Sequence, residues 1–339
     1  MIITRTPFRV TLGGGGTDLA SYYKNHGGFI FSFTLDKYMY INLKRAFTDD
    51  LIRVKYNISE TVASVSDIRH DIARECLKKV GLSKGIEIAS MADIPSGSGL
   101  GSSSTYTVGL LSALNNLKRN YISLCELAEQ ACEIEIGVLG KPMGKQDQYL
   151  AAFGGFLVMD IAKDGCVTVR DADVSVATLD DLRKNLLMFY TGLNRENKEI
   201  LAQQDLATKN NDESVMESLH YIKESGYRIL SLVEDGNITD LGVMFDEHWE
   251  YKKKMSKGVS NSHFDRIYTV AKANGAIGGK LSGAGGGGFF TFYCEEKQKQ
   301  LRAAMKSEGL RELRYDFDFE GTKVLANFMN YRATGYRMG

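Results

Sequence analysis

Glycine, serine and a few charged residues are placed where they could bind and transfer a phosphoryl group. The chain holds 35 glycines and only 3 prolines, and its glycines gather in three clusters, at 13–16, 97–101 and 283–288. Because glycine has no Cβ atom, it lets the backbone approach a ligand closely. Three such loops predict a small-molecule site rather than a purely structural protein.

The second cluster runs into a serine-rich segment between a predicted strand and a long predicted helix. Backbone N–H groups and the helix dipole at such a place favour phosphate, and serine hydroxyls can bind phosphate or Mg²⁺. No lysine occurs in 95–117, which excludes a Walker A loop, and a plain turn with a capping serine is the alternative. The predicted ATP-binding residues are Ser96, Gly97, Ser98, Gly99, Leu100, Gly101, Ser102, Ser103 and Ser104.

The third cluster matches the spacing of a dinucleotide-binding loop at Gly283, Gly285 and Gly288, but a strand, FFTFY, is predicted to follow it instead of a helix. Dinucleotide binding is therefore not expected here. The loop predicts a close approach to a phosphoryl group or a substrate, and a tight turn between two strands is the alternative.

Composition excludes several classes of protein. The chain has 339 residues, a length that suits about two domains, and 42 Lys+Arg balance 42 Asp+Glu. Neutrality argues against a nucleic-acid binder, and no apolar run is long enough to span a membrane. The five cysteines and five histidines show no metal-site spacing. We expect a cytoplasmic protein with reduced thiols that binds neither nucleic acid nor membrane; its oligomeric state is open, a homo-oligomer included.

Hydrophobic patterning predicts an α+β protein with domains at 1–180 and 181–339. Residues 196–274 contain four polar helical stretches with few strand signals. The predicted strands lie at 3–12, 29–35, 38–47, 85–91, 154–161, 166–172, 186–192, 275–283, 286–294 and 313–319, and further predicted helices at 67–80, 102–118, 122–136, 146–153 and 295–309.

The three glycine clusters together resemble the three motifs of the GHMP kinase superfamily, which includes galactokinase, homoserine kinase and mevalonate kinase. Arg5-Thr-Pro-Phe-Arg9-Val-Thr-Leu-Gly-Gly-Gly-Gly-Thr-Asp18 is similar to the first motif, Pro95-x-Gly-Ser-Gly-Leu-Gly-Ser-Ser-Ser to the second, and Lys280-Leu-Ser-Gly-Ala-Gly-Gly-Gly-Gly-Phe289 to the third. The resemblance implies an N-terminal domain like domain 2 of ribosomal protein S5 and a C-terminal ferredoxin-like domain, with ATP and substrate between them.

The resemblance also implies catalytic roles. Asp147 matches the catalytic aspartate of galactokinase-like members, as general base or orienter of the attacking hydroxyl, and Arg9 would sit beside it. Lys145 could contact phosphate, although a solvated lysine is the simpler interpretation. Without the resemblance, a helix-capping role for Asp147 would rank above catalysis, and a surface ion pair would be the common role for Arg9.

Metal and substrate ligands follow in the same way. Glu135 resembles the glutamate that holds Mg²⁺ with a motif-two serine, for which Ser103 is chosen and Ser102 ranks almost equally; an exposed Glu135, with Glu133 in its place, is the alternative. Asp18 resembles the aspartate that binds sugar hydroxyls, and Arg195 is a candidate anchor for a substrate phosphate. The predicted substrate-binding residues are Gly14, Gly15, Gly16, Thr17, Asp18, Arg195, Asn197, Ser282, Gly283, Ala284, Gly285 and Gly286.

Within the superfamily, the GGGGTD form of the first motif and Tyr190-Thr-Gly-Leu-Asn-Arg195 are most similar to kinases of D-glycero-D-manno-heptose 7-phosphate. The Glu and His of the galactokinase form are missing, which disfavours galactose. The resemblance implies an ATP- and Mg²⁺-dependent kinase that phosphorylates the anomeric hydroxyl of a heptose 7-phosphate, for nucleotide-activated heptose and surface polysaccharide. Another anomeric sugar kinase, fucokinase- or galactokinase-like, and a catalytically silent sugar sensor are the alternatives.

Overall fold

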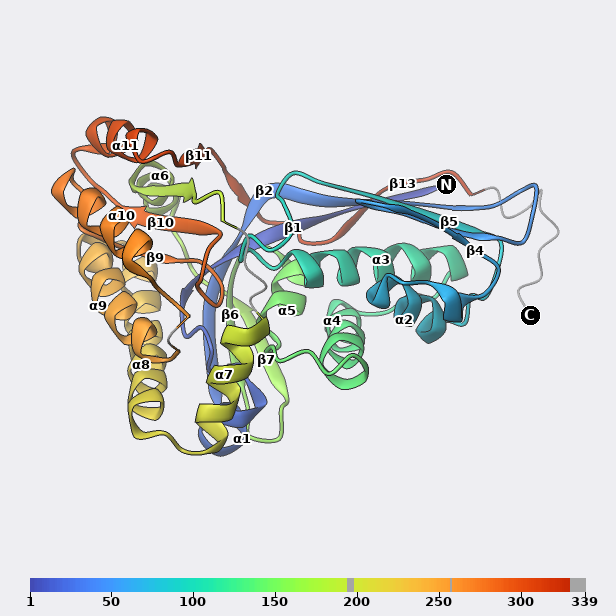
Figure 1. The fold of residues 1–339 in the computed structure, drawn as a ribbon, viewed down its shortest axis with the longest axis horizontal. Helices are drawn as coiled ribbons and strands as arrows, with labels where there is room; N and C mark the ends of the chain where they lie inside the picture. Colours follow the sequence, from blue (N-terminus) through green and yellow to red (C-terminus); the bar gives the residue numbers. More distant parts are fainter. Residues whose placement is uncertain (194–197, 257, 330–339) are drawn as a thin grey trace.

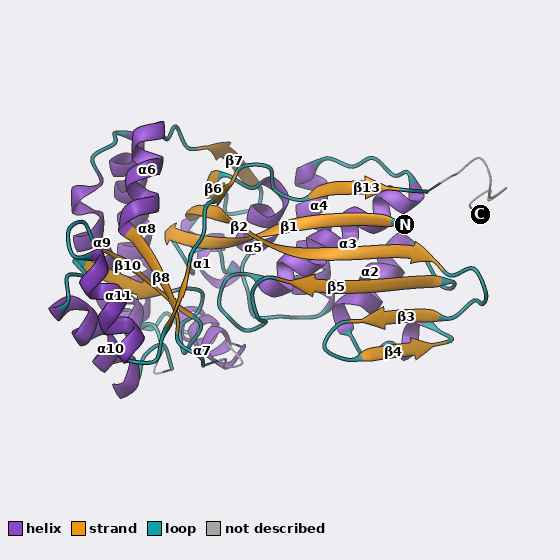
Figure 2. Ribbon diagram, turned by 90° about the horizontal axis from the view of Figure 1, so that it is seen from above, coloured by secondary structure: helices purple, strands orange, loops and turns teal. Residues whose placement is uncertain are grey.

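Two sheets organise the molecule (Figures 1 and 2). The computed structural model describes residues 1–193, 198–256 and 258–329. Its strands are β1 (Ile2–Gly13), β2 (Gly28–Arg45), β3 (Ile52–Lys55), β4 (Ser59–Val62), β5 (Ile86–Ala92), β6 (Phe156–Ile161), β7 (Val167–Asp171), β8 (Leu186–Tyr190), β9 (Gly278–Leu281), β10 (Phe289–Tyr293), β11 (Arg311–Leu313), β12 (Phe317–Asp318) and β13 (Lys323–Asn327). The nine-stranded sheet has the order β13-β1-β2-β5-β3-β4, with β6, β7 and β12 attached through β2.

The helices cover one face of the large sheet and gather around the small one (Figure 1). They are α1 (Ala20–His26), α2 (Asp71–Val80), α3 (Ser102–Lys118), α4 (Leu124–Cys132), α5 (Gln146–Phe153), α6 (Val176–Asn185), α7 (Lys198–Lys209), α8 (Glu213–Glu234), α9 (Leu241–Lys254), α10 (Ser262–Ala273) and α11 (Gln298–Ser307). Single 3₁₀ turns cover Val65–Asp67 and Ile238–Asp240, and a π-helical segment, Glu133–Val138, continues α4.

The antiparallel pair of β1 and β2 lies at the centre of the N-terminal half. The two strands pair antiparallel, and their register shifts between Pro7 and Arg9. A proline cannot donate to the ladder, and a bulge of this kind turns the following side chain in a new direction. The backbone N–H of Arg9 bonds the carbonyl of Leu100, 3.2 Å away, so the bulge ties β1 to the loop before α3.

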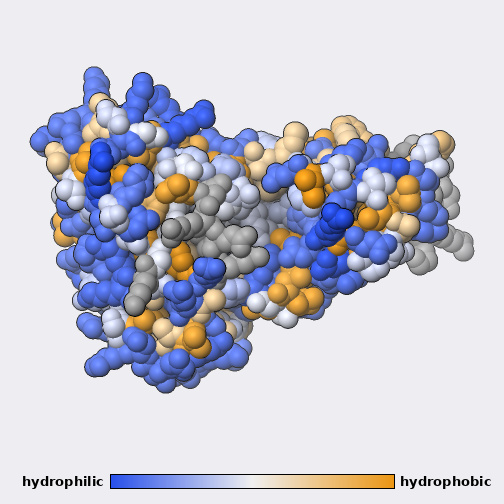
Figure 3. Space-filling model, in the orientation of Figure 1, coloured by the Kyte–Doolittle hydropathy of each residue, from blue (hydrophilic) through white to orange (hydrophobic). Residues whose placement is uncertain are grey.

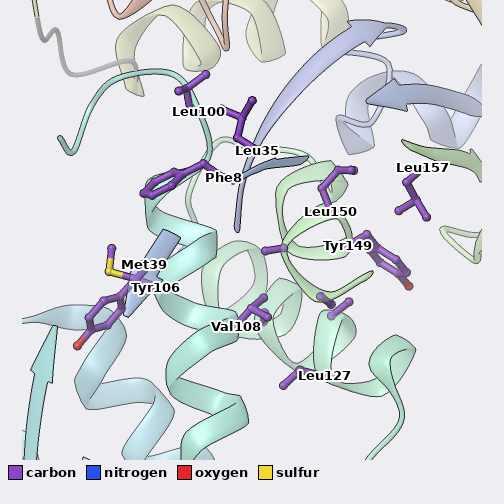
Figure 4. Close-up of a cluster of buried hydrophobic side chains, with 14 of the residues drawn as sticks. Phe8, Leu35, Met39, Leu100, Tyr106, Val108, Leu127, Tyr149, Leu150 and Leu157 are labelled. Carbon is purple, nitrogen blue, oxygen red and sulfur yellow. The ribbon is translucent and has the colours of Figure 1, made fainter. Parts of the chain in front are cut away.

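Helix α3 lies against the large sheet at the centre of the N-terminal half. All residues from 104 to 115 are buried, because β1 and β2 cover one side of the helix and α2, α4 and α5 the other. Figure 4 shows the cluster where these elements meet, with Phe8 of β1, Val108 of α3 and Leu150 of α5. Leu100 is fully buried in the same cluster. The buried side chain of Leu100 therefore anchors the loop at 97–101 to the hydrophobic core.

The C-terminal half is built on a four-stranded antiparallel sheet with the order β11-β8-β10-β9. The side chains of β8 and β10 are nearly all buried, as the unbroken apolar sequences of these strands require. Trp249 of α9 and Phe264 of α10 are fully buried in the same core as Phe290. The loop between β9 and β10 carries the third glycine cluster.

Most predicted elements are present, but two strand predictions were wrong. The strand expected at 313–319 is divided between β11 of the small sheet and β12 of the large sheet, with residues 314–316 outside both. The strands expected at 29–35 and 38–47 are the single strand β2. Asp36 and Lys37 interrupt the apolar alternation, but the chain stays extended there because β1 pairs with both segments. The small sheet lies wholly after residue 180, whereas β12 and β13 return from beyond it to the large sheet; the domain division at 180 stays a prediction.

Hydrophilic residues cover most of the face seen in Figure 3, with apolar residues in scattered groups. In the described ranges, no helix has both the length and the hydropathy needed to cross a membrane. All five cysteines are free thiols; Cys76, Cys132 and Cys294 are buried.

Candidate active site

The loop of the second glycine cluster alternates left-handed glycines and leads into α3. Gly97, Gly99 and Gly101 have φ values of 74°, 78° and 86°. Gly101 precedes the helix as its N-cap and offers no side chain, so the first N–H groups of a 17-residue helix remain available to a ligand. Together with the helix dipole, this arrangement provides an anion-binding site at residues 97–104.

This loop interlocks with the third glycine cluster. A Cβ atom on Gly99 would lie 2.6 Å from the carbonyl oxygen of Ser282, and one on Gly288 would lie 2.0 Å from that of Ser98. A Cβ atom on Gly283 would lie 2.8 Å from the Cα of Gly99. Only glycine permits backbones to approach so closely. The small C-terminal sheet is thereby held against the anion-binding loop.

Arg9 and Asp147 form a partly buried ion pair beside the loop. Nε and Nη2 of Arg9 lie 2.7 and 2.6 Å from Oδ1 of Asp147, and Nη1 donates to the carbonyl oxygen of Gly99 at 2.7 Å. Arg9 is only 5% exposed. Asp147 stands in the first turn of α5, but its side-chain hydrogen bonds within the described ranges go to Arg9 and not to a helix N–H. Arg9 therefore fixes one carboxylate oxygen of Asp147 beside the anion-binding loop.

A second carboxylate, Asp18, lies in the same region. Its oxygens accept from the backbone N–H and the side-chain amide of Gln146, at 3.1 and 3.2 Å, and from the backbone N–H of Gly16 at 3.3 Å. Burial raises the pKa of Asp18, and the neighbouring Asp147 carboxylate acts in the same direction, while the Gln146 N–H bond opposes them. Asp18 thus holds Gln146, the residue before Asp147, in place.

Ser103 and Glu135 meet at the start of α3, as the metal prediction requires. The Ser103 hydroxyl donates to Oε1 of Glu135, which is fully buried in the π-helical segment, and Gln148 donates to Oε2 at 2.9 Å. Glu133 points elsewhere, exposed and paired with Lys79. The Lys141 ammonium lies 2.9 Å from the Ser103 hydroxyl and 3.3 Å from Glu135. One carboxylate and one hydroxyl suit Mg²⁺ that takes its remaining ligands from phosphates and water.

Two cavities flank this machinery. A cavity of about 530 Å³ adjoins the loop, with Ser96 and Ser103 on its polar wall. Tyr56, His70 and Tyr106 form its aromatic wall, with ring centroids 4.6 Å apart in both successive pairs. An aromatic wall next to an anion-binding loop suits a nucleotide base joined to phosphates.

The second cavity, of about 110 Å³, lies where the two halves meet. Arg9, Asp18 and Asp147 line it from the N-terminal half, and Lys252 and Lys280 line it from the C-terminal half. We call it the acceptor pocket. Carboxylates on one wall and ammonium groups on the other suit a ligand that carries both hydroxyl groups and negative charge.

The other predicted site residues are spread around this centre. Gly15, Gly16, Ser282, Gly283 and Ala284 line the acceptor pocket. Thr17 is fully buried, and its hydroxyl donates to the carbonyl oxygens of Gly14 and Phe29, each at 2.8 Å, so it shapes the first glycine loop from within. The backbone N–H of Gly286 bonds the carbonyl of Val259.

Lys145 lies apart from the reacting groups. Its ammonium bonds Glu129 at 2.8 Å and the carbonyl oxygen of Gly165 at 2.9 Å, and it lines a separate neighbouring cavity. Arg195 and Asn197 fall outside the described residues. The roles of all these residues stay predictions.

Sequence reasoning gave no role to four polar residues near the centre. Lys141 joins the Ser103–Glu135 pair, and Lys252, Lys280 and His248 line the acceptor pocket. Lys252 opens a run of three lysines, which by itself indicates only a solvated helix end. Lys280 is the first residue of the third glycine motif, and this position was the one signal in the sequence that could have pointed to it.

The chain matches two models of one protein family. Residues 68–155 match the GHMP kinases N terminal domain, and residues 229–310 match the GHMP kinases C terminal domain. The first match covers the anion-binding loop, Glu135 and Asp147; the second covers Lys252, Lys280 and the third glycine cluster.

Individual proteins are similar over nearly the full chain. The D-glycero-alpha-D-manno-heptose 7-phosphate kinase of Campylobacter jejuni is 31% identical over 95% of this chain and 98% of that protein. The structure of a D-glycero-D-manno-heptose 1-phosphate kinase from Bacteroides thetaiotaomicron superposes with a TM-score of 0.79 at 25% identity, covering 97% of this chain and 100% of that one. A putative sugar kinase from Campylobacter jejuni gives a TM-score of 0.75 at 30% identity, covering 95% and 97%.

Proposed function

The chain belongs to the GHMP kinase family and is an ATP-dependent sugar kinase, and we propose that its acceptor is D-glycero-D-manno-heptose 7-phosphate, phosphorylated at the anomeric hydroxyl to the 1,7-bisphosphate. The observation that carries this proposal is the acceptor pocket itself. It presents two carboxylates that can accept sugar hydroxyls and two ammonium groups suited to a phosphate ester. The product would serve the synthesis of nucleotide-activated heptose for surface polysaccharide.

Asp147 is the group that takes or orients the proton of the attacking hydroxyl. In the transfer, the sugar oxygen forms a bond to the γ-phosphorus of ATP, the bond to the leaving oxygen of ADP breaks, and the hydroxyl proton must leave. The second oxygen of Asp147 is free of the contacts that Arg9 makes with Oδ1. A carboxylate within hydrogen-bond reach of the hydroxyl can accept that proton.

Arg9 contributes in two ways. Its guanidinium holds the Asp147 carboxylate in place through Oδ1, and its bond to the Gly99 carbonyl places positive charge beside the anion-binding loop. Charge builds on the transferred phosphoryl group in the transition state, so a fixed cation at this point favours the reaction.

Ser103 and Glu135 are the residues that would hold Mg²⁺. When bound, Mg²⁺ neutralises the negative charge of the ATP phosphates. The residues fit this use because a buried carboxylate and a hydroxyl already touch there, at the helix start where phosphates are expected. Lys141 meanwhile compensates the charge of Glu135.

The test is a coupled-ADP assay over a panel of hexoses, heptoses and their phosphates, with ³¹P NMR of the product. We expect the highest kcat/KM for the heptose 7-phosphate and a new anomeric phosphate resonance. Arg195→Ala is expected to raise KM more for a phosphorylated sugar than for an unphosphorylated one. Equal turnover of phosphorylated and unphosphorylated sugars would contradict recognition of a terminal phosphate.

A second candidate acceptor is a heptose 1-phosphate, the compound named for the similar Bacteroides thetaiotaomicron enzyme. It carries the same two chemical features, hydroxyls and a phosphate ester, with the ester at the other end of the sugar. The same panel separates the two, because phosphorylation of the 1-phosphate would leave the anomeric resonance in place and add one elsewhere.

A further inference from the structure

We propose that Lys252, Lys280, Gln204 and His248 form an anion subsite in the acceptor pocket, which binds the phosphate ester of the sugar substrate. The inference rests on the proposed function in one respect, namely that the acceptor is phosphorylated. The four residues come from α7, α9 and β9, all in the C-terminal half, and all line the acceptor pocket.

The two lysines are charged groups without a counter-ion in the described part of the chain. The Lys252 ammonium donates to the carbonyl oxygens of Leu281 and Gly283, at 2.7 and 2.5 Å. The Lys280 ammonium donates to the carbonyl oxygen of Leu12 at 2.5 Å and lies 4.8 Å from the ring centre of Phe245. By contrast, Arg9 and Lys141 each face a carboxylate within 3.3 Å.

Burying an ammonium without an anion is costly, and two close together cost more. Burial lowers the pKa of Lys252 to about 7 and that of Lys280 well below its ordinary value, and each group's cationic neighbours, Arg9 for Lys252 and Lys252 for Lys280, add to the effect. A bound dianion removes this penalty. The acceptor pocket therefore favours an anionic ligand.

Two further polar atoms in the pocket have no partner. Gln204 is only 5% exposed and His248 only 3%. Nevertheless, Nε2 of Gln204 and Nδ1 of His248 make no hydrogen bond among the described residues. The Gln204 amide packs on the first glycine loop, since a Cβ atom on Gly16 would lie 2.6 Å from Nε2. An amide nitrogen only donates, and the neutral imidazole can donate from one ring nitrogen.

The four groups thus present donors to one small space, whose facing wall holds the Asp18 and Asp147 carboxylates. Phosphate oxygens accept from such donors, and sugar hydroxyls donate to such carboxylates. The γ-phosphate of ATP is the other available phosphate. The sugar ester is favoured because none of the four residues lines the cavity beside Tyr106 and Ser96, and because Gln204 and Lys280 contact the first glycine loop and β1 instead of the anion-binding loop.

The experiment uses the full-length enzyme and the variants Lys252→Met and Lys280→Met, which keep the side-chain length and remove the charge. Lys254→Met is the matched control, because Lys254 is exposed and stacks on Tyr251. We measure KM and kcat for the heptose 7-phosphate, competition by inorganic phosphate, and calorimetric binding of ADP and of a non-hydrolysable ATP analogue. Circular dichroism verifies folding, and Lys252→Arg restores the charge.

For each Met variant we expect KM for the sugar phosphate to rise by about tenfold to a hundredfold, as the loss of a charge-assisted hydrogen bond implies. The control should not change, and Lys252→Arg should recover most of the affinity. Inorganic phosphate should compete with the sugar phosphate in the wild type and in the control, but not in the two Met variants. ADP and the ATP analogue should bind all variants equally. Unchanged KM in both folded variants, or weaker binding of the ATP analogue with an unchanged sugar-phosphate KM, would overturn the subsite; the second result assigns the lysines to the γ-phosphate.

Failure of the proposed substrate gives a different pattern. If the heptose 7-phosphate is not turned over, but inorganic phosphate or another sugar phosphate binds in a Lys252-dependent way, the anion subsite stands and the substrate assignment falls. If the heptose 7-phosphate is the substrate and the lysines do not affect its KM, the substrate assignment stands and the subsite falls.

Discussion

The two cavities on either side of the Arg9–Asp147 pair differ in the groups that line them. The cavity beside the anion-binding loop is lined mainly by serine hydroxyls, apolar side chains and the rings of Tyr56, His70 and Tyr106, together with the carboxylate of Asp71. The acceptor pocket is lined by charged groups, among them Asp18, Asp147, Lys252 and Lys280. Dipoles and hydroxyls suit a ligand common to the whole family, whereas placed charges can select one acceptor among many.

The two cavities also differ in how their lining residues are distributed along the sequence. The loop and helix start at 96–104 form one continuous segment, so neighbouring residues create the anion-binding site. The charges of the acceptor pocket come from β1, the loop after β1, α5, α9 and β9, and Arg9 and Asp147 are 138 positions apart. A continuous segment can change little without losing its geometry, while separate side chains can change one at a time. The comparison predicts that variants on the two sides affect different kinetic constants.

The largest effect is expected on the acceptor side, for Asp147→Asn, which removes the charge and keeps the shape. Because general-base contributions are typically about 10²- to 10⁴-fold, kcat should fall by at least about 10²-fold. Nucleotide affinity should barely change, because the phosphates are held by the loop. Steady-state kinetics with parallel ATP-binding measurements test this, with Asp181→Asn, an exposed residue of α6, as the control.

Arg9→Ala should lower kcat as well, and the double variant should lose less than the product of the two single effects if the residues act as a unit. A near-normal kcat in Asp147→Asn would mean that positioning and the metal carry the reaction. In that case, the charged wall would serve binding only.

The next effect tests the contact between the two glycine loops, where both sides of the comparison meet. Gly99→Ala places a methyl group 2.6 Å from the Ser282 carbonyl oxygen at a φ of 78°. Strain of this kind costs about 1–3 kcal/mol, and the backbone must shift as well. We expect both ATP affinity and sugar KM to deteriorate, in contrast to the one-sided effect of Asp147→Asn.

The matched control is Gly140→Ala, which has a φ of 61° but open space around the added methyl group. It should cost only the conformational strain, seen as a small decrease in thermal stability with unchanged kinetics. Equal kinetic effects of the two variants would show that the loops do not depend on their contact.

How much the sequence predicts follows the same division. The loop at 97–101, its position before a helix, and the strand after Gly288 were all predicted from local patterns, and the structure confirms these elements. Arg9 beside Asp147 was predicted only through the family resemblance, because no periodicity relates residues 138 positions apart. Lys252 and Gln204 were not assigned, because helical lysines and glutamines are usually solvated.

Two features of the fold were missed for a related reason. Tertiary pairing overrides local pattern in β2, where β1 keeps Asp36 and Lys37 within one strand. The strands β12 and β13 return to the N-terminal sheet over more than 270 positions in the chain, through partners that no local signal can name. The four polar helical stretches predicted at 196–274 are present as α7 to α10.

A smaller effect is expected on the nucleotide side for Glu135→Gln. The variant keeps the bond to Ser103 possible but removes the charge that a divalent cation requires. Since even outer-shell partners typically change metal affinity by about 10–100-fold, the Mg²⁺ concentration for half-maximal rate should rise by about tenfold or more. Glu133→Gln, two residues away and exposed, is the control. Equal Mg²⁺ dependence of the two variants would remove Glu135 from the metal site, and an unchanged KM for the sugar phosphate is expected in both.

The smallest effect is a pH dependence that should appear on the acceptor side alone. The pKa of Lys252 is lowered to about 7 by burial and by Arg9, and Lys280 and the neutral His248 also face it, with the Asp18 and Asp147 carboxylates on the opposite wall. Below this pKa the ammonium is present, and as pH rises through it the charge that binds the phosphate ester is lost. Therefore kcat/KM for the sugar phosphate should decrease by up to about tenfold from pH 7 to pH 8. A bound dianion favours the protonated lysine again, so kcat should stay flat. Asp18, whose pKa is raised, affects the rate only on the acidic side of the pH profile and does not contribute to this decrease.

Two comparisons check this prediction. The Lys252→Arg variant keeps its charge and should weaken the decrease in kcat/KM, and an unphosphorylated heptose should not show the decrease. If kcat/KM decreases equally with pH for the phosphorylated and the unphosphorylated sugar, the lysines do not bind the phosphate ester. The charged groups of the acceptor pocket would then distinguish it from the other cavity in composition, but would not determine which sugar it binds.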